Sequence, residues 1–154
     1  MDQIFSRRSV LGYAAGGAAG AVILSSAGPT LAAPMKFKAD MSGASEVPPT
    51  TSGGKGSLTA TYDPATKMLT WEGNFSGLTG PATAAHFHGP AEAGKNAGVE
   101  IWISEKGQTL SSPFKGQATL TDAQADDLQK GMLYVNVHTE ANKGGEIRGQ
   151  VVKA

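Results

Sequence analysis

The sequence predicts an all-β fold, an antiparallel, Greek-key-like β-sandwich or barrel with one short helix. Three observations lead to this fold class. Apolar and polar residues alternate with a period of two in several segments after residue 32, as in strands with one face in a core. Turns rich in glycine and proline separate these segments. The strand–helix–strand rhythm of a parallel sheet is absent, so we expect antiparallel pairing.

The first 32 residues have the pattern of an export signal. Arg7 and Arg8 precede an apolar run rich in glycine and alanine, and small residues around Ala32 and Ala33 provide a cleavage site. The paired arginines resemble the bacterial twin-arginine (Tat) signal. An uncleaved membrane anchor is the alternative, because apolar runs of about 18 residues can span a bilayer. The run contains few strongly apolar residues, so we expect cleavage, a periplasmic or extracellular location and no remaining membrane span.

Residues 33–154 have the length of one domain with its own core. The whole chain has 13 basic and 13 acidic residues, and this balance gives no basic surface for nucleic acid. It has no cysteine, which excludes disulfides, thiolate metal ligands and thiol nucleophiles. Sequence signatures of a nucleophile elbow, a phosphate loop or a dinucleotide site are also absent. We therefore favour a noncatalytic protein.

Alternation identifies the individual strands. In segment 68–75, Leu69 and Trp71 share the face expected to be buried. In segment 99–103, Trp102 is expected to point away from Ile101 into solvent. A further segment has Phe87 directed inward and its histidine neighbours outward. The segments predicted as strands in this way are 68–75, 85–88, 99–103, 133–138 and 146–151.

Two segments depart from alternation. Residues 121–131 predict one short structural helix, because Thr121 is a good N-cap, Gln124 completes a capping box and Gly131 ends the helix. Residues 41–56 are rich in Gly, Pro, Ser and Thr and are expected to form a long loop, and loops of that length are often functional.

The three histidines of the chain are the main candidate site. His86, His88 and His138 all have outward parity on their predicted strands. A His-x-His pair with a third strand histidine is suited to copper or zinc, provided that the two strands are neighbours in register. Water, Glu46 or Glu146 would then be the fourth ligand. The alternative is that the imidazoles hydrogen-bond the backbone of glycine-rich loops.

Other polar and aromatic residues have a structural and a functional interpretation. Glu146 and Arg148 share the outer face of the last strand, where they would form a surface ion pair, or Arg148 would attract an anion. Glu46, in a loop stiffened by the prolines that follow, accepts backbone N–H bonds or binds metal. Trp102 and Tyr134 form a half-exposed aromatic patch for a partner, or only cover the outer sheet.

Three stretches carry a family resemblance. "GASEVPP", "HFHGPA" and "LYVNVHTEANKGGEIRGQV" resemble the CHRD domain in order and spacing, from about Phe37 to Val151. The resemblance implies an antiparallel β-sandwich with the general shape of copper/zinc superoxide dismutase. It also implies an extracellular setting, as in chordin, which sequesters growth factors. A copy of the dismutase two-metal site is not expected, because that site needs more than three imidazoles and the disulfide cysteines are absent.

Two classes of function follow from these observations. The first is an exported, noncatalytic binding module whose partner is an unknown protein. The second is a small copper or zinc protein with a site at His86, His88 and His138, with redox chemistry as a further option. A metal assay separates the two classes.

Overall fold

The computed structural model describes residues 32–104 and 108–154. The predicted export signal lies outside these residues except for its last position, so the signal remains a prediction. Within the described ranges, no helix combines the length and apolar character needed to cross a membrane.

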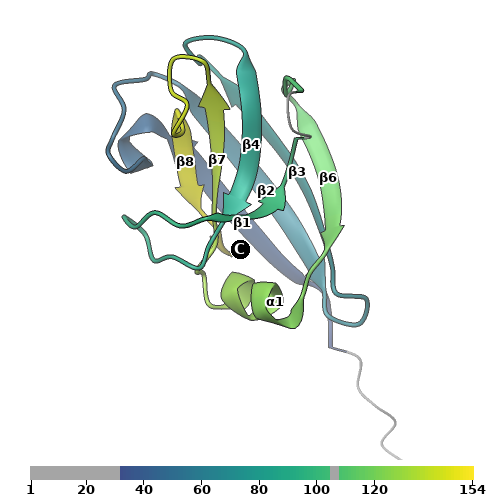
Figure 1. Cartoon of the computed structure of the whole chain (residues 1–154). Helices are drawn as coiled ribbons and strands as arrows, with labels where there is room; N and C mark the ends of the chain where they lie inside the picture. The colour runs from purple at the N-terminus through teal and green to yellow at the C-terminus, as the bar shows by residue number, and fades with distance from the viewer. Residues whose placement is uncertain (1–31, 105–107) are drawn as a thin grey trace, which may run out of the picture. The chain divides into compact units, whose positions relative to one another are not determined.

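The described residues form one nearly closed antiparallel barrel with a single short α-helix, which confirms the predicted fold class (Figure 1). The strands lie in the order β5-β4-β7-β8-β1-β2-β3-β6, and β9 pairs with β1. Neighbours that are distant in sequence, such as β4 with β7 and β8 with β1, distinguish this topology from a simple meander. The strands are β1 (Met35–Ser42), β2 (Lys55–Asp63), β3 (Met68–Ser76), β4 (Ala82–His88), β5 (Val99–Trp102), β6 (Phe114–Thr119), β7 (Tyr134–Thr139), β8 (Ile147–Gln150) and β9 (Val152–Lys153).

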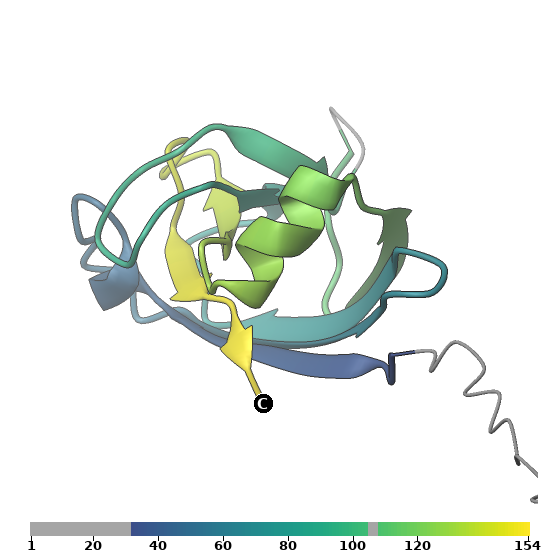
Figure 2. The same ribbon diagram turned by 90° about the horizontal axis from the view of Figure 1, so that it is seen from below.

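The helix α1 (Asp122–Gln129) lies across one end of the barrel (Figure 2). Its predicted capping box is present: Thr121 accepts from the Gln124 backbone, and the Gln124 side chain accepts from the Thr121 backbone. Gly131 follows with φ of +72°, a conformation that favours glycine. The helix contributes Ala125 and Leu128 to the core, so it has the structural role that its sequence indicates.

Several strand predictions are confirmed and others need correction. The alternating segments 68–75, 133–138 and 146–151 correspond to β3, β7 and β8 within one or two residues. Segment 99–103 corresponds to β5, and 85–88 covers the last four residues of β4. β1, β2, β6 and β9 were not predicted. The long loop is shorter than 41–56, because β1 runs to Ser42 and β2 begins at Lys55. A 3₁₀ turn, η1 (Gly43–Ser45), begins this loop.

The core lies inside the barrel, on the faces that alternation assigned to it. Phe37, Leu58, Leu69, Phe87 and Val135 from five strands are all buried there. The two tryptophans are placed as predicted, because Trp71 is buried and packs edge-on against the Phe87 ring, whereas Trp102 is 50% exposed.

The outer face of β4, β7 and β8 is also buried, contrary to expectation. All six residues of β7 are buried, although every second one is polar or aromatic and faces away from the barrel interior. Loops cover this face. Asn96 of one loop donates to the carbonyl of Val47 in another, and Thr50 donates to the Glu146 carbonyl beside the last strand. These loops create a second, polar interior outside the barrel wall.

Candidate metal centre

Two neighbouring strands carry the three histidines. β4 and β7 pair antiparallel, with Ala84 opposite His138 and Asn136 opposite His86. His86 and His88 are two residues apart on β4 and so share a face, and His138 has the same outward parity on β7. The condition for convergence, neighbouring strands in suitable register, is therefore met.

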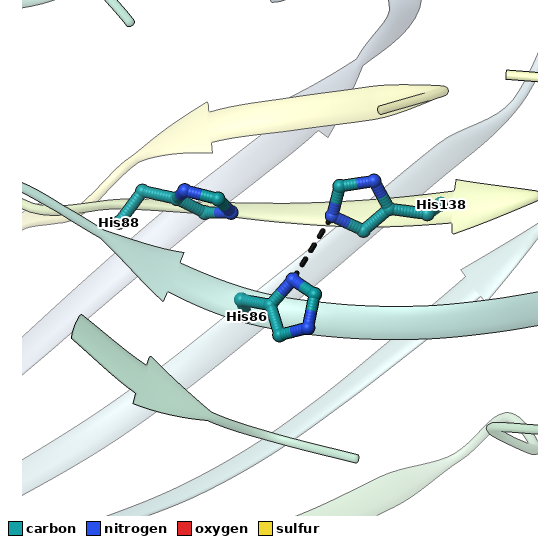
Figure 3. Close-up of side chains that lie close together, drawn as sticks. All are labelled: His86, His88 and His138. Carbon is teal, nitrogen blue, oxygen red and sulfur yellow. Dashed lines mark hydrogen bonds between the residues drawn. The ribbon is translucent and has the colours of Figure 1, made fainter. Parts of the chain in front are cut away.

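The imidazoles converge at the centre of this face. Figure 3 shows the two rings from β4 and the ring from β7 turned toward one another. One nitrogen from each histidine can be chosen so that all three lie within 4.8 Å of one another. His86 Nδ1 and His138 Nε2 are 3.1 Å apart. The three histidines therefore meet the geometric condition for one site, and metal binding there stays a prediction.

Outward parity predicted that the three imidazole rings would be exposed to solvent. They are buried instead. His86, His88 and His138 are only 7%, 8% and 8% exposed. Trp102 packs edge-on against His86 with ring centroids 4.2 Å apart, and Tyr134 stacks on His88 at 4.9 Å. The predicted half-exposed aromatic patch is therefore wrong, because Tyr134 and the histidines are buried and only Trp102 reaches solvent.

Backbone carbonyls fix the tautomers of two rings. His88 Nδ1 lies 3.1 Å from the Ala97 carbonyl and His138 Nδ1 lies 3.0 Å from the Lys143 carbonyl. A carbonyl only accepts, so both Nδ1 atoms carry a proton and both Nε2 atoms present a lone pair. His138 Nε2 accepts from His86 Nδ1, while the Nε2 atoms of His86 and His88 have no partner. This arrangement is typical of histidines that are oriented for metal binding.

The surroundings keep the imidazoles neutral. Burial, reinforced by the other two imidazoles, lowers the pKa of His86 from 6.5 to about 4. Burial also lowers the pKa of His88 and of His138. All three rings are therefore in the uncharged form, which is the form that binds a metal ion, at neutral pH.

Glu46 lies beside the site but outside the histidine group. The group of metal-binding side chains found among the described residues contains the three imidazoles and no carboxylate. Glu46 is buried, and this burial raises the pKa of its carboxyl from 4.5 to about 7, although Arg148 and the Val47 N–H act in the opposite direction. Its Oε1 has no hydrogen-bond partner. Glu46 is thus a neighbour of the site rather than one of its converging ligands.

Glu146 is a buried anchor, not a metal ligand. Oε1 accepts from Ser52 Oγ at 2.6 Å and from the Thr79 backbone N–H at 2.7 Å. Oε2 accepts from Thr79 Oγ1 at 2.7 Å, Thr139 Oγ1 at 2.5 Å and Asn142 Nδ2 at 3.2 Å. Burial alone would raise the pKa of this carboxyl, but these donors hold it at about 2. The oxygens are fully used, so Glu146 is not available to a metal.

The predicted surface ion pair between Glu146 and Arg148 is wrong. Both side chains are buried, and the ion pairs among the described residues do not include them. The Arg148 guanidinium donates to Asn96 Oδ1 at 3.0 Å and to the Lys95 carbonyl at 2.6 Å. It lies 3.4 Å from the centre of the Tyr134 ring. Arg148 therefore fastens the 89–98 loop over the site.

The spacing of the imidazoles suits a transition-metal ion. Two nitrogens bound at 2.0–2.1 Å to one ion lie about 2.9 Å apart at a right angle and about 3.4 Å apart at a tetrahedral angle. His86 Nδ1 and His138 Nε2, which are 3.1 Å apart, fall within this range, and His86 Nδ1 becomes a ligand when its proton moves to Nε2 of the same ring. The third nitrogen, from His88, lies within 4.8 Å of the other two. Sequence reasoning missed Asn136 as a neighbour of the site, although it shares the outward parity of the histidines.

Comparison with known proteins identifies a family but no close relative. The family model of the CHRD domain matches residues 37–151. No curated protein and no solved structure gives a significant match.

Proposed function

Because this chain belongs to the CHRD domain family, we propose that it is an exported, noncatalytic binding module whose bound species is a single copper(II) or zinc ion. The convergence of His86, His88 and His138 in a buried, uncharged cluster carries this proposal. Export is supported by the paired arginines Arg7 and Arg8. Proteins exported by the Tat route often fold first, which allows a metal to be bound before export.

A purely structural role explains the cluster less well than metal binding does. Histidines that only pin loops need one hydrogen bond each, and burying a polar nitrogen without a partner costs free energy. Here the Nε2 atoms of His86 and His88 are both buried and without a partner. The lone pairs of His88 Nε2 and His138 Nε2 belong to the converging group, together with His86 Nδ1. A cation at the centre would bind these two lone pairs, and that of His86 Nδ1 once its proton moves to Nε2.

Metal analysis and titration calorimetry on protein without a histidine tag test the proposal. We expect one copper(II) or zinc ion per chain, since all three histidines of the sequence belong to this cluster. Replacing any one of them by Ala should lower the affinity at least tenfold. Glu92→Ala, which removes an exposed carboxylate from the 89–98 loop, is the control and should bind like the wild type. Equal binding by the triple His→Ala variant would exclude the site.

Bound metal should also stabilise the fold. An ion held only by the native state stabilises it by about 2.7 kcal/mol when its concentration is 100 times Kd. The unfolding temperature of the wild type should therefore rise with added metal and fall again with a chelator, whereas that of the triple variant should not change.

A further inference from the structure

Buried polar atoms without partners gather around the histidine cluster. Six such side-chain atoms occur among the described residues. Four of them belong to the cluster or its immediate neighbours, namely His86 Nε2, His88 Nε2, Asn136 Oδ1 and Glu46 Oε1. Asn136 is 2% exposed, faces His86 across the strand pair and precedes His138 by two residues on the same face of β7. Its amide oxygen is thus at the site itself.

The surroundings determine which way the Asn136 amide points. Its Nδ2 donates a long bond of 3.5 Å to the Gly144 carbonyl. The Glu46 carboxyl lies on the same side, because a Cβ built on Gly145 would be 2.4 Å from Glu46 Oε1 and 2.6 Å from Asn136 Nδ2. The Gly144 carbonyl only accepts, and the Glu46 carboxylate also only accepts when it is ionised, so a flipped amide would then set its oxygen against two other oxygens. The NH₂ group must therefore face Gly144 and Glu46.

This orientation directs the amide oxygen toward the imidazoles. Asn136 lies opposite His86 in the strand pair, and its outward parity places its side chain on the face that carries the three imidazoles. The proton of the His88 ring is already committed to Ala97 through Nδ1. The Asn136 oxygen and His88 Nε2 therefore bring two buried lone pairs into one small space, and neither has a donor. A positive ion between them satisfies both.

We propose that Asn136 is the fourth ligand of the site, binding the ion through Oδ1, and that Glu46 is a positioning residue that holds the amide in this orientation. The inference rests on the metal site proposed above. Three imidazole nitrogens and one amide oxygen form a donor set that suits copper(II) in a tetragonal geometry. Gly145 makes this arrangement possible, because its φ of +133° and its lack of a side chain let Glu46 approach Asn136.

Copper(II) titration and electron paramagnetic resonance test the role of Asn136. Asn136→Ala should lower copper affinity at least tenfold and change the g and hyperfine values, since an oxygen ligand is lost. If that variant does not fold, Asn136→Val keeps a residue that fits a strand and serves instead. Asn136→Asp in a Glu46→Gln background retains an oxygen without placing two carboxylates together, and it should restore much of the affinity.

The role of Glu46 is tested by a matched pair. Glu46→Gln retains an acceptor for the Asn136 NH₂ group and should leave the copper spectrum unchanged, whereas Glu46→Ala should lower affinity and broaden the spectrum. A wild type that binds no copper would refute both the metal site and the fourth ligand. A wild type that binds copper with the same affinity and spectrum as Asn136→Ala would overturn only the fourth ligand.

Discussion

Replacing Glu146 by Gln removes one buried charge and tests the polar interior outside the barrel wall. The carboxylate accepts five hydrogen bonds, from Ser52, Thr79 twice, Thr139 and Asn142. An amide keeps one oxygen for Ser52 and the Thr79 backbone. Its NH₂ group replaces the other oxygen.

The hydrogen bonds of Glu146 give the expected loss of unfolding free energy in Glu146→Gln. The hydroxyls of Thr79 and Thr139 can turn and accept from the new NH₂ group, but the Asn142 amide cannot, because its NH₂ group only donates. Hydrogen bonds to a charged group contribute about 1.5–3 kcal/mol each. Losing one and weakening the others should therefore cost about 2–4 kcal/mol of unfolding free energy. Because the bonds form a network, we do not expect their contributions to add.

Urea unfolding at pH 7 measures this loss, and Glu140→Gln is the matched control. The Glu140→Gln substitution is the same chemical change near the same loop. The side chains of Glu140 and of its ion-pair partner Lys143 are highly exposed. An exposed pair contributes about 0–1 kcal/mol. If Glu146→Gln were no more destabilising than Glu140→Gln, the assignment of Glu146 as a buried anchor would be refuted.

The pH dependence of the same variant provides a second test. The folded state holds the pKa of Glu146 at about 2, below its ordinary value of 4.5, so between these values the unfolded state binds more protons. The stabilisation is complete above about pH 4.5 and is lost as the pH falls toward 2. The stability difference between wild type and Glu146→Gln should therefore narrow over that range. A constant difference would contradict the shift.

Three further predictions concern the core, the helix and export. Trp71→Ala should cost about 3–5 kcal/mol in urea unfolding, whereas Trp102→Ala, at a half-exposed position, should cost much less; the reverse order would contradict the assignment of the faces. Thr121→Ala removes the bond that the Gln124 backbone N–H donates to the Thr121 hydroxyl, and it should lower stability by about 1 kcal/mol in thermal unfolding; an unchanged midpoint would show that this cap is dispensable. Changing Arg7 and Arg8 to Lys should trap the precursor in the cytoplasm, which cell fractionation measures. Normal export of this variant would contradict Tat dependence and leave only a general secretory signal.

The sequence predicted the fold class and the direction of most core side chains for a physical reason. A strand with one face in the core must alternate, and Leu69 and Trp71 on one side of β3 report this directly. β1 and β2 were missed although they also alternate. Their buried faces include Ala39 and Ala60, and small residues reduce the contrast on which the prediction depends.

The sequence could predict that the histidines face the same way, but not what surrounds them. Polar residues on an outer face were taken as exposed, which holds for antiparallel sheets with one face in water. Arg148 and Asn136 are buried instead, because loops distant in sequence fold over β7 and β8. Alternation describes only the two faces of a strand. It carries no information about a loop that covers one of them.

The distribution of satisfied and unsatisfied groups in this covered face supports the location of the site. Burying polar groups is costly unless each finds a partner. Glu146 and Arg148 are well supplied with partners and fasten the surrounding loops. The loop held by Glu146 also carries the Lys143 carbonyl that orients His138. Four of the six unpartnered atoms among the described residues belong to His86, His88, Asn136 and Glu46, beneath the loops that these bonds hold. Because Glu146 and Arg148 are satisfied while these atoms are not, the covered face supports the cation site that we propose at this point.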